Sequence, residues 1–262
     1  MDRVALRDPE GVRFVPDVPS GDAALVIAGS SGRVDVDRAA WFAAHGFVAE
    51  SFRWFGGPRQ HDGPWEVPLE SFVDRIERLR TTSDRVWVVG TSLGSEAALL
   101  VGGQPGVAGV VAFAPSDVVW SWPDASGVPR SHWTLGGEPL PFVAVDPADS
   151  DREVPPRFRP RYERSYRRDP ARTERATIRV DGIRKLLLVA GGDDQVWPSR
   201  DSADRIVARR SAAGLGTVLV TAAAAAGHRT VLPGEPVLTG GQTMQRGGSG
   251  GGGTRPRVRT GA

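Results

Sequence analysis

The chain has 262 residues, of which 40% are hydrophobic and 24% charged, so it is long and apolar enough to bury a substantial core and is not a disordered chain. Its 33 Lys and Arg against 31 Asp and Glu leave a net charge of +2, which is too small to indicate a nucleic-acid-binding surface. The absence of cysteine excludes a disulfide framework, a cysteine nucleophile and a cysteine-ligated metal site.

The predicted elements alternate along the chain. Apolar runs and helical periodicity predict a strand at 23–28, a helix at 36–46, a strand at 47–52, a helix at 69–79, a strand at 86–89, a helix at 95–101 and a strand at 107–114. A strand at 186–190, a helix at 201–210 and a strand at 216–221 follow after an interruption. The pattern predicts an α/β domain over 1–239, with a doubly wound, mostly parallel sheet. The Gly- and Pro-rich segment 54–68 is expected to be loop.

The interruption at 117–178 is rich in Trp, Pro and Arg and has no clear periodicity. About 60 such residues inside a compact domain favour a cap insertion over a site, and a disordered insertion is the alternative. Nine arginines lie in 152–175. Most are expected on a solvated face, and a few are candidates to bind a phosphorylated small molecule.

The segment 240–262 is glycine-rich and holds four arginines and no acid, so the rest of the chain carries a net charge of −2. This composition predicts a disordered tail. The first 20 residues are charged throughout, and no stretch reaches the roughly 18 apolar residues of a membrane span. We therefore expect a cytoplasmic protein without a membrane or nucleic-acid partner.

The strongest motif is G-x-S-x-G at 90–94, which lies between a predicted strand and a predicted helix. In a nucleophile elbow this turn exposes the serine, here Ser92, and places the N–H of the next residue, Leu93, where it can stabilise an oxyanion. The second oxyanion donor is expected from Ser30 or Ser31, in the turn after the first strand. The alternative is an ordinary Gly-rich turn in which Ser92 caps the helix.

A serine nucleophile needs a base and an orienting acid, which in this kind of site follow in the order Ser, Asp or Glu, His. Of the four histidines only His228 follows the last predicted strand, so it is the expected general base. The acid is Asp194 or Asp193, and Asp194 is preferred because it lies four residues before Pro198. No metal-binding or nucleotide-binding pattern is present, so no cofactor is expected.

Several segments together resemble the catalytic C-terminal domain of the acyl-CoA thioesterase and bile acid-CoA:amino acid N-acyltransferase family, which has the α/β-hydrolase fold. The resemblance spans about 21–241 and is carried by GTSLGSEAALL (90–100), VVAFAPSDVVW (110–120), SHWTLGGEPLPFV (131–143), GGDDQVWPS (191–199) and GHRTVLPGEPVLTGG (227–241). It implies Ser92 as nucleophile, Asp194 as acid and His228 as base. Family members normally close with a helix after the histidine loop, where this chain has its glycine-rich segment, so reduced stability or activity is expected.

The resemblance implies an acyl-CoA thioesterase whose substrate is a small-molecule acyl-CoA or a related ester. Trp120, Trp122 and Trp133 are expected either to line the acyl pocket or to pack in the core of the cap insertion. Three alternatives remain open. The first is a carboxylesterase or dienelactone-type hydrolase, the second is an acyl-CoA N-acyltransferase, and the third is a non-catalytic protein with a truncated hydrolase fold. The sequence leaves acyl-chain length and oligomeric state open.

Overall fold

A computed structural model describes residues 1–145, 153–221, 225–236, 245–248 and 257–260. Within these ranges, nine strands form the central sheet in the order β1-β2-β4-β3-β6-β7-β12-β13-β14. Its parallel part comprises β4 (Val48–Phe52), β3 (Asp22–Ile27), β6 (Arg85–Thr91), β7 (Val107–Phe113), β12 (Leu186–Ala190) and β13 (Val218–Thr221). The six strands predicted from apolar runs are therefore all present and parallel, within a few residues of their expected bounds.

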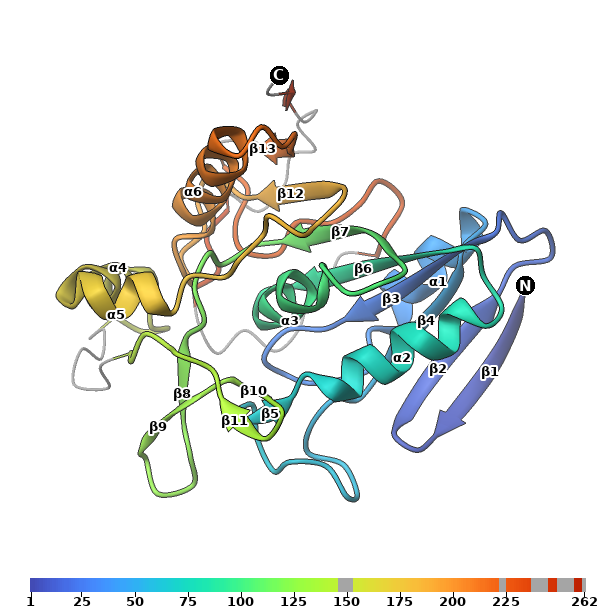
Figure 1. Ribbon diagram of the computed structural model, residues 1–262, viewed down its shortest axis with the longest axis horizontal. Helices are drawn as coiled ribbons and strands as arrows, with labels where there is room; N and C mark the ends of the chain where they lie inside the picture. The colour runs from blue at the N-terminus through green and yellow to red at the C-terminus, as the bar shows by residue number, and fades with distance from the viewer. Residues whose placement is uncertain (146–152, 222–224, 237–244, 249–256, 261–262) are drawn as a thin grey trace.

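Helices cover both faces of the sheet (Figure 1). Helix α1 (Val36–Ala44) packs on one face, with Ala39, Phe42 and Ala43 buried against the strands. Helices α2 (Glu70–Arg80), α3 (Leu93–Val101) and α6 (Ser199–Ala212) cover the other face and enclose the larger core. The prediction of a doubly wound sheet is confirmed, because apolar side chains of the central strands leave the sheet on both sides.

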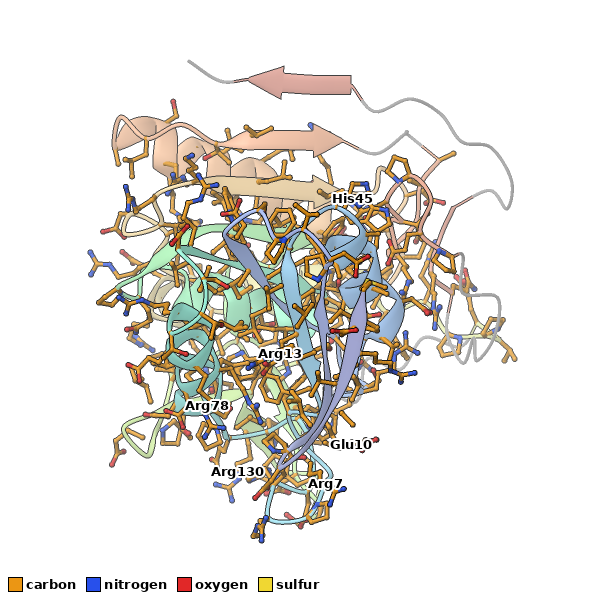
Figure 2. The ribbon with its side chains drawn as sticks, turned by 90° about the vertical axis from the view of Figure 1, so that its right-hand side faces the viewer. Arg7, Glu10, Arg13, His45, Arg78 and Arg130 are labelled. Atoms are coloured by element: carbon orange, nitrogen blue, oxygen red, sulfur yellow. The ribbon has the colours of Figure 1, made fainter. Side chains whose placement is uncertain are left out.

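The N-terminal residues form a hairpin that no apolar run in the sequence indicates. Strands β1 (Asp2–Arg7) and β2 (Glu10–Val15) pair antiparallel, and β2 pairs antiparallel with β4. Figure 2 shows this hairpin in front, with the short strand β14 (Arg257–Thr260) at the opposite edge, where it pairs with β13. Strand β1 is largely exposed, so its sequence lacks the apolar run that marks the central strands.

The segment between β7 and β12 forms a small structure of its own beside the sheet (Figure 1). It contains β8 (Ser121–Pro123), β9 (Pro129–Ser131), β10 (Trp133–Leu135), β11 (Glu138–Pro139), α4 (Arg159–Arg168) and α5 (Pro170–Arg175). Strand β10 pairs with β5 (Val67–Pro68), in a stretch expected to be loop. A third apolar cluster, separate from those on the two faces of the sheet, holds α4 in place. In it the ring of Trp120 packs edge-on against that of Tyr162, with the ring centroids 4.8 Å apart.

A buried carboxylate joins this segment to helix α6. Asp117, at its start, accepts hydrogen bonds from Arg205 at 2.8 and 2.9 Å, from Arg209 at 3.1 Å and from the Tyr166 hydroxyl at 3.2 Å. Burial alone would raise the pKa of Asp117, but the two guanidinium groups outweigh it and hold that pKa below its ordinary value.

Most of the segment 240–262, for which a disordered tail is expected, lies outside the described residues, but 245–248 contact the rest of the protein. Residues 245–248 lie against the loops at 193–195 and 226–228, where Arg246 and Gly248 make backbone hydrogen bonds. Backbone N–H and C=O groups, which every composition supplies, make these contacts, so the glycine content gave no signal for them. In the described ranges no helix is long and apolar enough to cross a membrane.

Candidate active site

Ser92 lies on a sharp turn between strand β6 and helix α3. Its φ of 56° and ψ of −124° fall in a region that non-glycine residues rarely adopt. The flanking glycines make the turn possible: a Cβ atom on Gly90 would lie 2.2 Å from the Gly94 carbonyl oxygen, and one on Gly94 would lie 2.3 Å from the Ala28 carbonyl oxygen. The strained turn and the two close approaches are the geometry of a nucleophile elbow.

Ser92, His228 and Asp194 form a continuous hydrogen-bonded chain. The Ser92 Oγ lies 2.8 Å from Nε2 of His228, and Nδ1 of His228 lies 2.8 Å from Oδ2 of Asp194. The serine is 136 residues from the histidine in sequence, and β6 and the loop after β13 bring them together. A carboxylate on Nδ1 fixes the imidazole with its proton on that atom, so that Nε2 is free to accept the serine proton.

The two candidate acids differ sharply in their surroundings. Asp194 is fully buried, and besides His228 it accepts hydrogen bonds from the Ser199 hydroxyl at 2.5 Å and from the Val196 N–H at 2.9 Å. Asp193 accepts the N–H of Gly248 at 2.9 Å and a hydrogen bond from the Gln195 side chain, and these two donors lower its pKa. Of the two, it is therefore Asp194 that the structure brings to the histidine.

The turn after β3 lies directly beside the serine. A Cβ atom on Gly29 would lie 3.1 Å from Cβ of Ser92, and Ser30 and Ser31 border the same cavity as the serine. Leu93 is the first residue of α3, so its N–H is one of the unpaired donors at a helix N-terminus. The structure thus brings together all three residues predicted as oxyanion donors.

The serine opens on a cavity of about 360 Å³ between the sheet and the segment 117–178. Its aromatic lining is Trp122, Phe158, Tyr162 and Trp197. Of the three tryptophans expected either at the pocket or in the core of the cap, Trp122 borders the cavity, whereas Trp120 and Trp133 do not line it. Both are buried, Trp120 in the apolar cluster under α4 and Trp133 in the main core, 5.3 Å from the ring of Trp54.

Four arginines, Arg33, Arg161, Arg229 and Arg246, also border the cavity. Among the described residues, Nε of Arg161 and both Nε and Nη2 of Arg229 are buried without a hydrogen-bond partner. Burial lowers the pKa of Arg229, and carboxylate oxygens of Asp35 and Glu235 each lie 4.0 Å from its Nη2. Of these four, only Arg161 comes from the basic stretch 152–175, and Arg159 of the same stretch pairs with Glu163 and Asp201.

The sheet order, the elbow after β6 and the acid and histidine that follow β12 and β13 define the architecture. The chain has the α/β-hydrolase fold. No family model matches the sequence, and the comparison with curated proteins returned no match. The described residues contain no cluster of three His, Asp or Glu side chains placed to hold a metal ion.

Solved structures with a similar course of the chain share little sequence with it. A protein of Thermus thermophilus is 18% identical over 80% of this chain and 82% of that chain, with a TM-score of 0.42. The monoacylglycerol lipase of Paleococcus ferrophilus is 18% identical over 79% and 84%, with a TM-score of 0.46. An esterase of Pyrococcus furiosus is 10% identical over 81% and 76%, with a TM-score of 0.48.

Proposed function

We propose that the protein is a serine hydrolase of ester or thioester bonds, with Ser92 as nucleophile, His228 as general base and Asp194 as orienting acid. The observation that carries this proposal is the hydrogen-bonded chain from Asp194 through His228 to Ser92, which ends in a cavity large enough for a small acyl group.

The reaction follows from the proposed roles. His228 takes the Ser92 proton as Oγ attacks the carbonyl carbon, and the N–H of Leu93 with that of Ser30 or Ser31 stabilises the oxyanion. The bond to the leaving group breaks, and the leaving thiol or alcohol departs with the proton from His228. Water then attacks the acyl-enzyme while His228 takes its proton, and Ser92 is regenerated with release of the acid.

Within this class we propose acyl-CoA thioesters as substrates. The CoA portion carries phosphates, and planar guanidinium groups bind phosphate with paired hydrogen bonds. Arg161 and Arg229 support this choice, since both border the cavity and have buried N–H groups without a partner among the described residues. The sequence resemblance to acyl-CoA thioesterases points to the same substrates.

Two measurements test the hydrolase. Ser92→Ala is expected to abolish both turnover of acyl-CoA and p-nitrophenyl esters and labelling by a fluorophosphonate probe. Unlabelled wild-type protein without turnover would instead indicate a non-catalytic member of the fold. Turnover retained in pure Ser92→Ala protein would refute the role given to Ser92.

A third measurement tests the acyl-CoA choice. Arg161→Gln and Arg229→Gln are expected to raise KM for butyryl-CoA about tenfold and to change KM for p-nitrophenyl butyrate much less, because only the CoA ester carries phosphates. Equal effects on both substrates would favour a carboxylesterase or dienelactone-type hydrolase. Transfer of the acyl group to an added amino acid, in preference to water, would favour an N-acyltransferase.

A further inference from the structure

A second carboxylate–histidine pair lies beside the proposed triad and takes no part in it. Glu96 follows Ser92 by four residues, so it lies one turn further along helix α3, and it is fully buried. Nδ1 of His132 lies 2.9 Å from its Oε2, and the ring of His132 is itself buried and borders the cavity that holds Ser92.

The contacts of Glu96 fix the protonation of His132. The same Oε2 atom accepts the indole N–H of Trp133 at 3.0 Å and the backbone N–H of Trp120 at 3.4 Å, and both of these groups only donate. Burial raises the pKa of Glu96, but both of these donors approach Oε2, so we assign this oxygen as the acceptor toward His132 and the proton of the neutral ring to Nδ1. In the neutral ring, Nε2 is then a hydrogen-bond acceptor.

Two polar atoms of this pair are buried without a partner among the described residues: Nε2 of His132 and Oε1 of Glu96. Buried polar groups in folded proteins nearly always have partners, because an unmet one loses its hydration without compensation. Fixing the segment 117–178 to α3 needs only the Nδ1 contact and the two tryptophan contacts. The unpartnered Nε2, on a ring that borders the cavity, is therefore unexplained by an anchoring role.

We propose that His132 binds an O–H or N–H donor of the substrate through Nε2, and that Glu96 is the residue that positions it. The site would accordingly select substrates with a hydrogen-bond donor close to the scissile carbonyl, either a hydroxyl on the acyl chain or the first amide of a pantetheine-type leaving group. This inference rests on the proposed hydrolase and adds a specificity that the triad does not supply.

Two substrate pairs separate the two sources of the donor. 3-Hydroxybutyryl-CoA against butyryl-CoA tests a hydroxyl on the acyl chain. The butyryl thioester of N-acetylcysteamine against that of ethanethiol tests the leaving-group amide. The readout is the ratio of kcat/KM within each pair, so a general loss of activity cancels.

Two substitutions at one position separate binding from anchoring. Asn places its amide near the Nδ1 position and keeps the contact to Glu96, whereas Gln reaches the Nε2 position. His132→Asn is expected to lower the donor preference in one of the two pairs about tenfold, and His132→Gln to restore part of it. His45→Asn, on the exposed end of α1 (Figure 2), is the matched control and is expected to leave both ratios unchanged.

An unchanged ratio in both pairs for His132→Asn would overturn the proposal, as would an equal loss for every substrate. Binding of 3-hydroxybutyryl-CoA, N-acetylcysteamine and their donor-free counterparts, followed by tryptophan fluorescence, gives a readout that needs no turnover. If wild-type protein turns over none of these substrates, the proposed function fails. The His132 inference then stands only if His132→Asn weakens binding of a donor-bearing ligand relative to its counterpart.

Discussion

Arg38 and Glu235, 197 residues apart in the chain, form a two-point ion pair in which both side chains are buried. Nε of Arg38 donates to Oε1 of Glu235 at 2.9 Å and Nη2 donates to Oε2 at 2.8 Å. Nη1 of Arg38 reaches the hydroxyl of Thr91, the neighbour of Ser92, at 2.7 Å. Nη2 of Arg38 also donates to the Thr230 carbonyl, so the pair connects α1, the residue before Ser92 and the segment that follows His228.

Arg38→Met is expected to lower the free energy of unfolding by about 3–5 kcal/mol, because it leaves the Glu235 carboxylate buried without its partner. Urea denaturation measures this loss. The double variant Arg38→Met with Glu235→Leu is expected to recover much of the stability but not the activity, since the His228 loop is no longer held to α1. Wild-type stability in Arg38→Met would contradict the role given to the pair.

Asp194 and Asp193 are neighbours in the chain, so the same substitution at each position tests which of the two acids orients His228. Asp194→Asn is expected to lower kcat by about 10³- to 10⁴-fold, because the amide no longer stabilises the protonated histidine and favours the wrong tautomer. Asp193→Asn is expected to change kcat less than tenfold, since its contacts go to Gln195 and Gly248. Steady-state kinetics with one ester substrate compares the two, and an equal loss would contradict the distinction between them.

Sequence patterns were sufficient to predict the fold and to select Asp194, His228 and Ser92, the three residues that the structure joins by hydrogen bonds. Strand β3 is buried along its whole length and therefore appears as an unbroken apolar run, while the elbow requires glycines within two residues of Ser92. Both constraints act over a few residues, so the sequence alone displays them.

Features that depend on distant partners could not be predicted in the same way. The sequence left Trp120, Trp122 and Trp133 equally suited to a pocket lining and to a core. The burial of Trp120 and Trp133 is decided by Tyr162 and Trp54, which come from other parts of the chain. The exposed hairpin β1–β2 gave too weak a pattern, and the Arg246 contacts use backbone atoms that no composition reveals. Long-range packing determined each of these outcomes.

Ser92 stores backbone strain that can be measured directly. Both Ser92→Ala and Ser92→Gly remove the hydroxyl, but only glycine adopts a φ of 56° without steric conflict. Ser92→Gly is expected to be more stable than Ser92→Ala by about 1 kcal/mol, in spite of the entropy that glycine adds to the unfolded chain. Denaturant titration of the two inactive variants measures the difference, and a more stable alanine variant would argue against strain at the elbow.

Asp117 is expected to make stability depend on pH on the acid side. Its pKa in the folded protein is lower than the ordinary value, so its contribution to stability is present above the unfolded pKa of about 3.9 and is lost as the pH falls through the folded pKa. Asp117→Asn should lower the free energy of unfolding by about 2 kcal/mol at pH 7.

The difference between wild type and Asp117→Asn should shrink as urea denaturation is repeated from pH 5 down to pH 3. Asp204→Asn is the control, because Asp204 pairs with Arg200 on the exposed side of the same helix α6 and such surface pairs contribute little. A difference that stays constant over this range would show that the charge of Asp117 is not the cause.

Residues 245–248 supply backbone partners to the proposed catalytic loops, which makes their removal informative. The Arg246 carbonyl accepts the N–H of His228 at 2.7 Å, and the Gly248 N–H donates to Asp193. A chain that ends after Met244 loses both contacts, whereas a chain that ends after Gly248 keeps them. We expect kcat/KM to fall about tenfold or more in the shorter chain, since one lost hydrogen bond to a catalytic loop amounts to about 1–2 kcal/mol. Chains of the two lengths with equal activity would show that these contacts do not position His228.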